Sequence, residues 1–160
     1  MRKFIVILLL ILYPVIGRTV DDAEYFSSLK YNKVNWRSGP GERYPIKWVY
    51  QEQGYPVKVL DKYDVWRQVQ EADGSIGWVR KSMLSDRRTV LVQEEGSLLT
   101  KPDENAYTVA IVQQGTIGKI LKCPAGLSYC LLSFIHEGKT IKGWFPRTFV
   151  WGVGPNEEID

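Results

Sequence analysis

The sequence of 160 residues is poor in the side chains on which much of enzyme catalysis depends. It has a single histidine, His136, and two cysteines, Cys123 and Cys130. A serine-protease triad needs a histidine beside its nucleophile, and a structural zinc site needs four ligands. No glycine-rich phosphate loop or dinucleotide-binding fingerprint occurs either. These shortages argue against an enzyme, a metal site and a bound cofactor, and they favour a binding protein.

Long apolar runs are also missing, with one short exception at the N-terminus. Arg2 and Lys3 precede an apolar run of 14 residues, 4–17, whereas a membrane-spanning helix needs about 20. A basic start, an apolar centre and small residues at the −3 and −1 positions of a cleavage point after Gly17 predict a signal peptide over residues 1–17. The protein is therefore expected to be exported, to the periplasm or out of the cell, with no stable membrane span after cleavage. Retention of the segment as an anchor stays an alternative.

A concentrated basic surface is missing as well. Loss of Arg2 and Lys3 with the signal peptide would lower the number of basic residues from 21 to 19, against 18 acidic ones. Nucleic-acid binding needs a clustered Lys/Arg face, so no nucleic-acid partner is expected. The sequence ends on a short acidic tail, residues 154–160.

The residues that are abundant favour short strands and tight turns. The chain has 6 Trp, 9 Tyr and 14 Gly, and no stretch after residue 30 shows a helical apolar period. Val57 and Val59 alternate with Lys58, as in a half-buried strand. Asp-Gly at 73–74 and Glu-Gly at 137–138 each lie between two such runs and predict hairpin turns. The fold class is therefore all-β.

The chain also carries a diverged internal repeat. Four segments of its second half match segments of the first at shared proline, glycine and apolar positions, with an offset that grows from about 61 to 66 residues. The matching segments are 36–40 with 98–102, 53–60 with 114–121, 66–70 with 130–134, and 77–79 with 143–145. The repeat predicts two tandem five-stranded barrels. The expected order is a signal peptide (1–17), a linker (18–30), a first domain (31–85), a second domain (86–153) and the tail (154–160).

The first copy resembles a bacterial SH3-like domain of the tandem, exported type. The resemblance rests on Asn35, Trp36, Arg37 and the Gly-Pro at 39–40, followed by the segments 54–59, 66–69 and 74–79, and it covers residues 34–84. It implies a non-catalytic module that binds cell-wall peptidoglycan or protein segments. The second copy ends like that of such tandem proteins but lacks counterparts of Asn35 and Arg37, so the contact is expected in the first copy.

The candidate contact residues are aromatic and basic. Tyr44, Trp48 and Trp66 combine an apolar face with a polar tip and suit a partly exposed groove. Arg37 and Arg67 are expected to pair with a carboxylate of a stem peptide, although solvated arginines remain the alternative. The core is expected to contain Trp36, Val57, Val59, Val69 and Trp78.

A second hypothesis is an adaptor that binds a periplasmic protein or peptide. Its groove would be occupied by that partner or by a segment of the same chain, either residues 18–30 or the tail.

The two cysteines are expected to form a disulfide. Cys123 and Cys130 close a loop of eight residues in the second copy, and an exported protein folds where disulfides persist. Cys130 aligns with Trp66 in the repeat, so the bridge would replace lost aromatic packing. Zinc binding by the two cysteines and His136 lacks a fourth ligand, and a Cys–His peptidase site would need more chain than is present.

Overall fold

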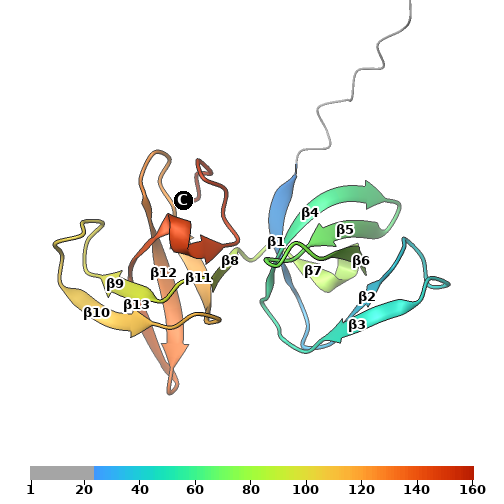
Figure 1. Cartoon of the computed structure of the whole chain (residues 1–160), viewed down its shortest axis with the longest axis horizontal. Coiled ribbons are helices and arrows are strands. Elements are labelled where there is room, and N and C mark those ends of the chain that lie inside the picture. The colour runs from blue at the N-terminus through green and yellow to red at the C-terminus, as the bar shows by residue number, and fades with distance from the viewer. Residues whose placement is uncertain (1–23) are drawn as a thin grey trace, which may run out of the picture.

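The protein consists of two β-rich lobes that lie side by side (Figure 1). The structure is a computed structural model that describes residues 24–160, and the predicted signal peptide lies outside them. Each lobe is built on one seven-stranded sheet in which every pairing is antiparallel. The prediction of an all-β chain with two small tandem domains is confirmed.

The first sheet has the strand order β3-β2-β6-β5-β4-β1-β7. Its strands are β1 (Tyr25–Leu29), β2 (Val34–Arg37), β3 (Ile46–Tyr50), β4 (Pro56–Tyr63), β5 (Trp66–Gln70), β6 (Ile76–Arg80) and β7 (Leu84–Ser85). A short 3-10 helix, η2 (Lys81–Met83), separates the last two strands.

The second sheet has the order β10-β9-β13-β12-β11-β8-β14, which is the first order with every number raised by seven. Its strands are β8 (Thr89–Val92), β9 (Gly96–Leu99), β10 (Thr108–Val112), β11 (Ile117–Lys122), β12 (Tyr129–His136), β13 (Lys139–Pro146) and β14 (Val150–Trp151). A second 3-10 helix, η3 (Arg147–Phe149), again precedes the final strand. The two lobes therefore repeat one topology, as the sequence repeat predicts.

The first sheet has seven strands instead of the expected five because β1 comes from the expected linker and the short strand β7 ends the lobe. The second sheet has the equivalent strands β8 and β14. Strand β1 lies within residues 18–30, where it pairs with β4 and β7. Ser27, Ser28 and Leu29 are all buried, so this strand lacks the inside–outside alternation by which a strand is identified in a sequence. The two-residue strands β7 and β14 are too short to show any period.

The core of the first lobe is close to the predicted one. Trp36, Val57, Val59 and Val69 are buried. The prediction of Trp78 as a core residue is wrong, because β6 turns Gly77 and Val79 inward and leaves Trp78 half-buried. The strand has this phase because the ring of Trp36 occupies the space above Gly77.

The core of the second lobe contains the disulfide. Cys123 and Cys130 are bonded, as predicted, and they are fully buried in one cluster with Leu132 and Phe145. The two hairpin turns also fall where the sequence places them, between β5 and β6 and between β12 and β13. Gly74 and Gly138 both have a positive φ there, which glycine adopts without strain.

The strand pairing corrects the alignment of Cys130 with Trp66 by one residue. Opposite the equivalent glycines, Val69 pairs with Gly77 and Leu132 pairs with Gly143. Val69 and Leu132 are therefore counterparts. Trp66 lies three residues before Val69, and Tyr129 lies three residues before Leu132, so Tyr129 is the counterpart of Trp66. The disulfide therefore does not stand in for the Trp66 ring.

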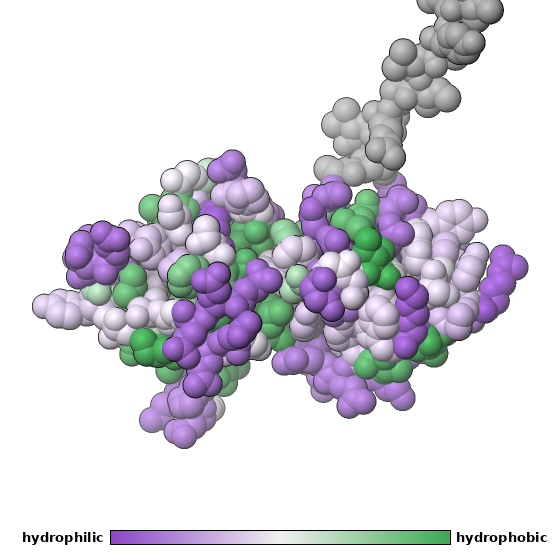
Figure 2. All heavy atoms as spheres, viewed as in Figure 1, coloured by the Kyte–Doolittle hydropathy of each residue, from purple (hydrophilic) through white to green (hydrophobic). Residues whose placement is uncertain are grey.

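The two lobes touch through their strands β1 and β4 on one side and β8 and β14 on the other. The rings of Phe26 and Trp151 meet edge to face, with centroids 5.1 Å apart. The Thr89 hydroxyl donates a 2.7 Å hydrogen bond to the Gly54 carbonyl. Figure 2 shows hydrophobic side chains gathered where the lobes meet.

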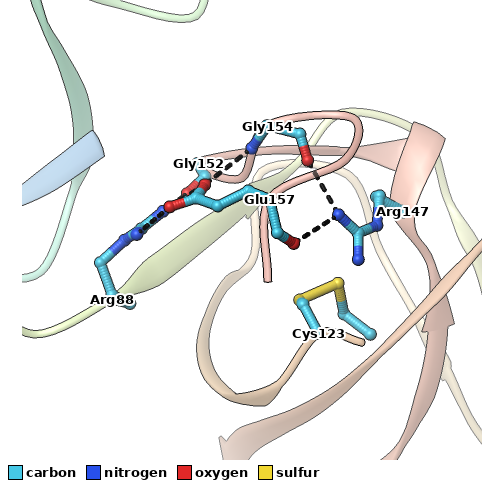
Figure 3. Close-up of polar contacts among 7 residues, drawn as sticks. Arg88, Cys123, Arg147, Gly152, Gly154 and Glu157 are labelled. Carbon is cyan, nitrogen blue, oxygen red and sulfur yellow. Dashed lines mark hydrogen bonds and ion pairs between the residues drawn. A yellow bond between two sulfur atoms is a disulfide. The ribbon is translucent and has the colours of Figure 1, made fainter. Parts of the chain in front are cut away.

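The acidic tail folds onto the second lobe and not onto the first. Glu157 pairs with Arg88, and its Oε2 accepts a hydrogen bond from the Gly154 amide (Figure 3). The buried Arg147 donates hydrogen bonds to tail carbonyls at Gly154, Pro155 and Glu157. The hypothesis that the tail occupies the groove of the first domain is wrong, since these contacts hold residues 154–157 beside the disulfide.

Candidate functional site

The first lobe carries a groove lined by aromatic rings. It has a volume of about 540 Å³, and Trp48, Tyr50 and Tyr55 line it. The Trp36 ring supports it from below, stacked on Trp48 at 5.2 Å, and the Tyr50 and Tyr55 rings lie 5.3 Å apart. We call this surface the aromatic groove. A row of rings fixed by the core offers flat apolar faces to a ligand without a large loss of side-chain entropy.

One end of the aromatic groove is acidic. Glu71 and Asp73, from the end of β5 and the loop that follows it, line the groove together with Glu52, and no basic residue does. Burial of Glu71, together with the nearby charge of Asp73, raises the pKa of its carboxyl to about 7, and a hydrogen bond from the Trp48 indole N–H opposes the shift. Hydrogen bonds from the backbone and side chain of Ser75 lower the pKa of Asp73. The groove therefore carries an Asp73 carboxylate beside a Glu71 that titrates near neutral pH.

Two of the predicted contact residues organise a loop instead of lining this groove. Arg37 ends β2, and its Nη1 donates hydrogen bonds of 2.9 and 2.7 Å to the carbonyls of Glu42 and Tyr44. The Tyr44 ring packs over Gly39, where a Cβ atom would lie 2.4 Å from it. These contacts fix the loop 38–45 between β2 and β3. Arg37 therefore has less hydrogen-bonding capacity left for a ligand than the sequence suggests.

A second pocket, of about 300 Å³, lies beside this loop and brings Arg37 and Trp66 together, with Arg80 and Glu42. The expectation of a partly exposed Trp66 is wrong, since it is only 6% exposed. The Arg80 guanidinium lies 5.3 Å from the Trp66 ring centre and is held there by an ion pair with Glu42. We call this hollow the arginine pocket.

Of the five predicted contact residues, only Trp48 lines the aromatic groove, and only Arg37 and Trp66 line the arginine pocket. The Nη1 of Arg67 donates hydrogen bonds to the carbonyls of Asp64 and Trp66, at the turn between β4 and β5.

The sequence did not point to the other rings and the carboxyl groups of the aromatic groove, among them Tyr50, Tyr55, Glu71 and Asp73. A signal for Tyr50 is present, because it follows Trp48 by two residues on one strand and therefore shares its face. Glu71 and Asp73 come from the turn between β5 and β6. Only the pairing of the strands brings that turn to the rings.

Within residues 24–160, no group of three or more His, Cys, Asp or Glu side chains is arranged to hold a metal ion. The same part of the chain contains no helix of the length and apolarity that a membrane crossing requires.

Comparison with known families identifies the family of the first lobe. The sequence model of the bacterial SH3 domain matches residues 30–86, which include β2 to β7 and both hollows. The first lobe is a bacterial SH3 domain. This is the same domain in which the sequence predicts the contact with a ligand.

Three solved structures are similar to the chain at low identity. NlpC1 from Trichomonas vaginalis is 14% identical, with a TM-score of 0.36 over 88% of this chain and 50% of that one. NlpC2 from the same organism is 12% identical, with a TM-score of 0.36 over 81% and 48%. An NlpC/P60 family protein from Bacillus cereus is 15% identical, with a TM-score of 0.33 over 79% and 55%. The chain spans about half the length of these proteins. Comparison with curated proteins finds no match.

Proposed function

We propose that the protein is an exported, non-enzymatic module that binds cell-wall peptidoglycan through the aromatic groove of its SH3 domain. The observation that carries this proposal is the combination of three rings, Trp48, Tyr50 and Tyr55, with the carboxyl groups of Glu71 and Asp73. Flat rings suit the apolar faces of sugars and peptides, and carboxylates suit ammonium groups. Peptidoglycan has sugar rings and peptide stems in one polymer, and amino acids with a free amine occur in such stems.

In this proposal the predicted residues divide into two roles. Trp48 contacts the ligand directly, since it lines the groove and its ring is held on Trp36. Arg37 and Tyr44 are positioning residues that hold the loop 38–45 in shape. The arginine pocket, in which Arg80 covers the buried Trp66 ring, is a second, smaller contact.

The test is sedimentation of the chain from residue 18 onward with insoluble peptidoglycan sacculi, at low and moderate salt. This chain retains every residue that the structure describes. Pelleting that survives moderate salt is expected, because stacking on rings is not screened by ions. Trp48→Ala should reduce the bound fraction about tenfold, as truncation of a central aromatic contact does. Tyr63→Ala is the matched control, since Tyr63 is 62% exposed and lies outside the groove. Pelleting at low salt only, or equal loss in both variants, would contradict the proposal.

The adaptor alternative has one observation in its favour. Strand β10 forms an edge of the second sheet, and it exposes Val109 and Ile111 next to Tyr107, which is 86% exposed. Unpaired edges with apolar side chains accept a further strand from a partner. Absence of pelleting with sacculi, together with crosslinking of an envelope protein from a photoreactive residue at position 109, would favour the adaptor.

A further inference from the structure

A cleft of about 800 Å³ lies between the two lobes and plays no part in the proposed function. One wall is formed by the first lobe, at the end of β1 and in the loop between β3 and β4. The other is formed by the second lobe, on strands β11, β12 and β13. Gly54 and Thr89 both line this cleft, and the hydrogen bond between them joins its two walls.

The lining of this interdomain cleft is basic. Lys30 and Arg87 line it from the first lobe and its connection, Lys119 and Lys142 line it from the second, and no lining residue is acidic. Asp86, although adjacent to Arg87 in the sequence, does not line the cleft. All four basic residues are exposed, so their charged groups are accessible to a ligand.

These four cations have no acidic partner within residues 24–160, so no carboxylate neutralises them in the cleft. Elsewhere the chain pairs Lys58 with Glu24, Arg80 with Glu42, Arg88 with Glu157 and Lys122 with Asp160. Among residues 24–160, none of the four cleft cations makes such a pair, and the Lys30 ammonium lies instead over the Tyr31 ring, 5.5 Å from its centre. Positive charge is therefore left uncompensated in one concave place.

Two of the cations are held in a fixed row by the sheet. Lys119 on β11 pairs with Ser133 on β12, which pairs with Lys142 on β13. Neighbouring strands lie about 4.8 Å apart, so the backbone positions of the two lysines are about 10 Å apart. Like charges on one face of a sheet repel each other, and a bound anion would remove this repulsion.

Hydroxyl groups complete the row. Ser133 lies between the two lysines, and Thr140 lies two residues before Lys142 on the same face of β13. Both line the cleft, and within residues 24–160 neither hydroxyl makes a hydrogen bond to the protein. Ammonium groups with free hydroxyl donors between them suit a phosphate group, whose several oxygens accept hydrogen bonds at once.

We propose that the interdomain cleft binds a ligand with two or more phosphate groups, which Lys119 and Lys142 hold from one lobe and Arg87 and Lys30 from the other. The spacing of the lysines and the presence of cations on both walls favour a multivalent ligand over a single phosphate. The phosphates could belong to a soluble oligophosphate or to lipid headgroups, and both use the same chemistry.

The test is calorimetric titration of the chain from residue 18 onward with sodium tripolyphosphate, with orthophosphate as the monovalent comparison. Tripolyphosphate should bind more tightly than orthophosphate. The double variant Lys119→Gln/Lys142→Gln should weaken the binding of tripolyphosphate about tenfold, as expected for two exposed charge contacts. The matched control is Lys81→Gln/Lys101→Gln, which removes the same charge from exposed positions outside the cleft and should change the affinity less than about twofold.

Three results would overturn the proposal: no binding of tripolyphosphate, equal weakening by both double variants, or equal affinity for orthophosphate and tripolyphosphate. Co-sedimentation with phosphatidylglycerol vesicles, compared with phosphatidylcholine vesicles, identifies the source of the phosphates. Loss of phosphatidylglycerol binding in the cleft variant alone assigns the site to lipid headgroups. Tripolyphosphate binding without vesicle binding assigns it to a soluble ligand. Trp48→Ala should leave both measurements unchanged. The proposal for the interdomain cleft and the proposal for the aromatic groove can therefore be refuted independently.

Discussion

The indole ring of Trp36 lies so close above Gly77 that a Cβ atom at residue 77 would fall 1.7 Å from its Nε1. Trp36 is fully buried and supports the Trp48 ring of the aromatic groove. The same relation occurs in the second lobe, where a Cβ at Gly143 would fall 2.6 Å from Cγ of Leu98. Each lobe therefore needs a glycine at this position, because a buried side chain occupies the space that a Cβ atom would take. That side chain is Trp36 in the first lobe and Leu98 in the second.

Gly77→Ala is therefore expected to destabilise the first lobe. The new methyl group must displace a fully buried ring, and overpacking of this kind costs about 2–3 kcal/mol. Urea unfolding followed by tryptophan fluorescence measures the loss. The double variant Trp36→Leu/Gly77→Ala should lose at least about 1 kcal/mol less than the sum of the single changes, because the smaller side chain leaves room. Strict additivity would show that the ring and the glycine do not conflict.

Glu71 should make the stability of the first lobe depend on pH between 4.5 and 7. Its pKa in the folded protein is about 7, against an ordinary value of 4.5, so the folded protein holds the proton more tightly than the unfolded chain. Stability then falls as the pH rises through this range, and it levels off above it. Glu71→Gln should flatten the profile and raise the melting temperature at pH 8, since the amide oxygen still accepts the Trp48 hydrogen bond.

The control for this prediction is Glu52→Gln. Glu52 lines the same groove but is not among the groups that shift the pKa of Glu71. Its variant should keep the wild-type pH profile. A wild-type melting temperature that does not change between pH 5 and pH 8 would contradict the assignment.

The sequence predicts the repeat, the strands, the turns and the disulfide because each depends on nearby residues. Asp73 and Gly74 are adjacent, and Cys123 and Cys130 close a short loop, so local rules apply to both. Strand β1 escapes prediction because three consecutive residues, 27–29, are all buried, and no period marks them.

The candidate site was less predictable because it depends on which strands meet. Trp48 and Tyr50 share a face of β3, but the carboxyl of Glu71 reaches them only through the arrangement of β5 and the loop after it. The burial of Trp66 follows from contact with Arg80, fourteen residues later, and from the ion pair of Arg80 with Glu42. Side-chain type alone does not distinguish an exposed ring from a covered one.

Arg147 is expected to be essential for the position of the C-terminal tail. Its Nη1 donates hydrogen bonds to three tail carbonyls, and its Nη2 donates one to the carbonyl of Pro124 in the disulfide loop. Lysine keeps the charge but cannot reproduce this fork, so Arg147→Lys should destabilise the second lobe by about 2–4 kcal/mol. Hydrogen exchange should accelerate at the amides of Cys123 and Ile159, which bond to each other's carbonyls. Arg43→Lys, at an exposed position of the other lobe, is the control, and unchanged exchange in Arg147→Lys would contradict the role.

Trp151 is expected to hold the two lobes at a fixed angle. Its ring meets Phe26 across the junction, and the Arg88 guanidinium lies 5.9 Å from the centre of the Phe26 ring. Trp151→Ala removes the ring contact and leaves the Thr89–Gly54 hydrogen bond as the main polar link, so the lobes should reorient independently. Residual dipolar couplings then require a different alignment tensor for each lobe, whereas one tensor fits both lobes of the parent. Tyr107→Ala, which removes a ring exposed on the second lobe, should keep the single tensor. A single tensor in Trp151→Ala would show that the backbone connection, the Thr89–Gly54 hydrogen bond and the Arg88–Phe26 contact are enough to fix the angle, and with it the width of the interdomain cleft.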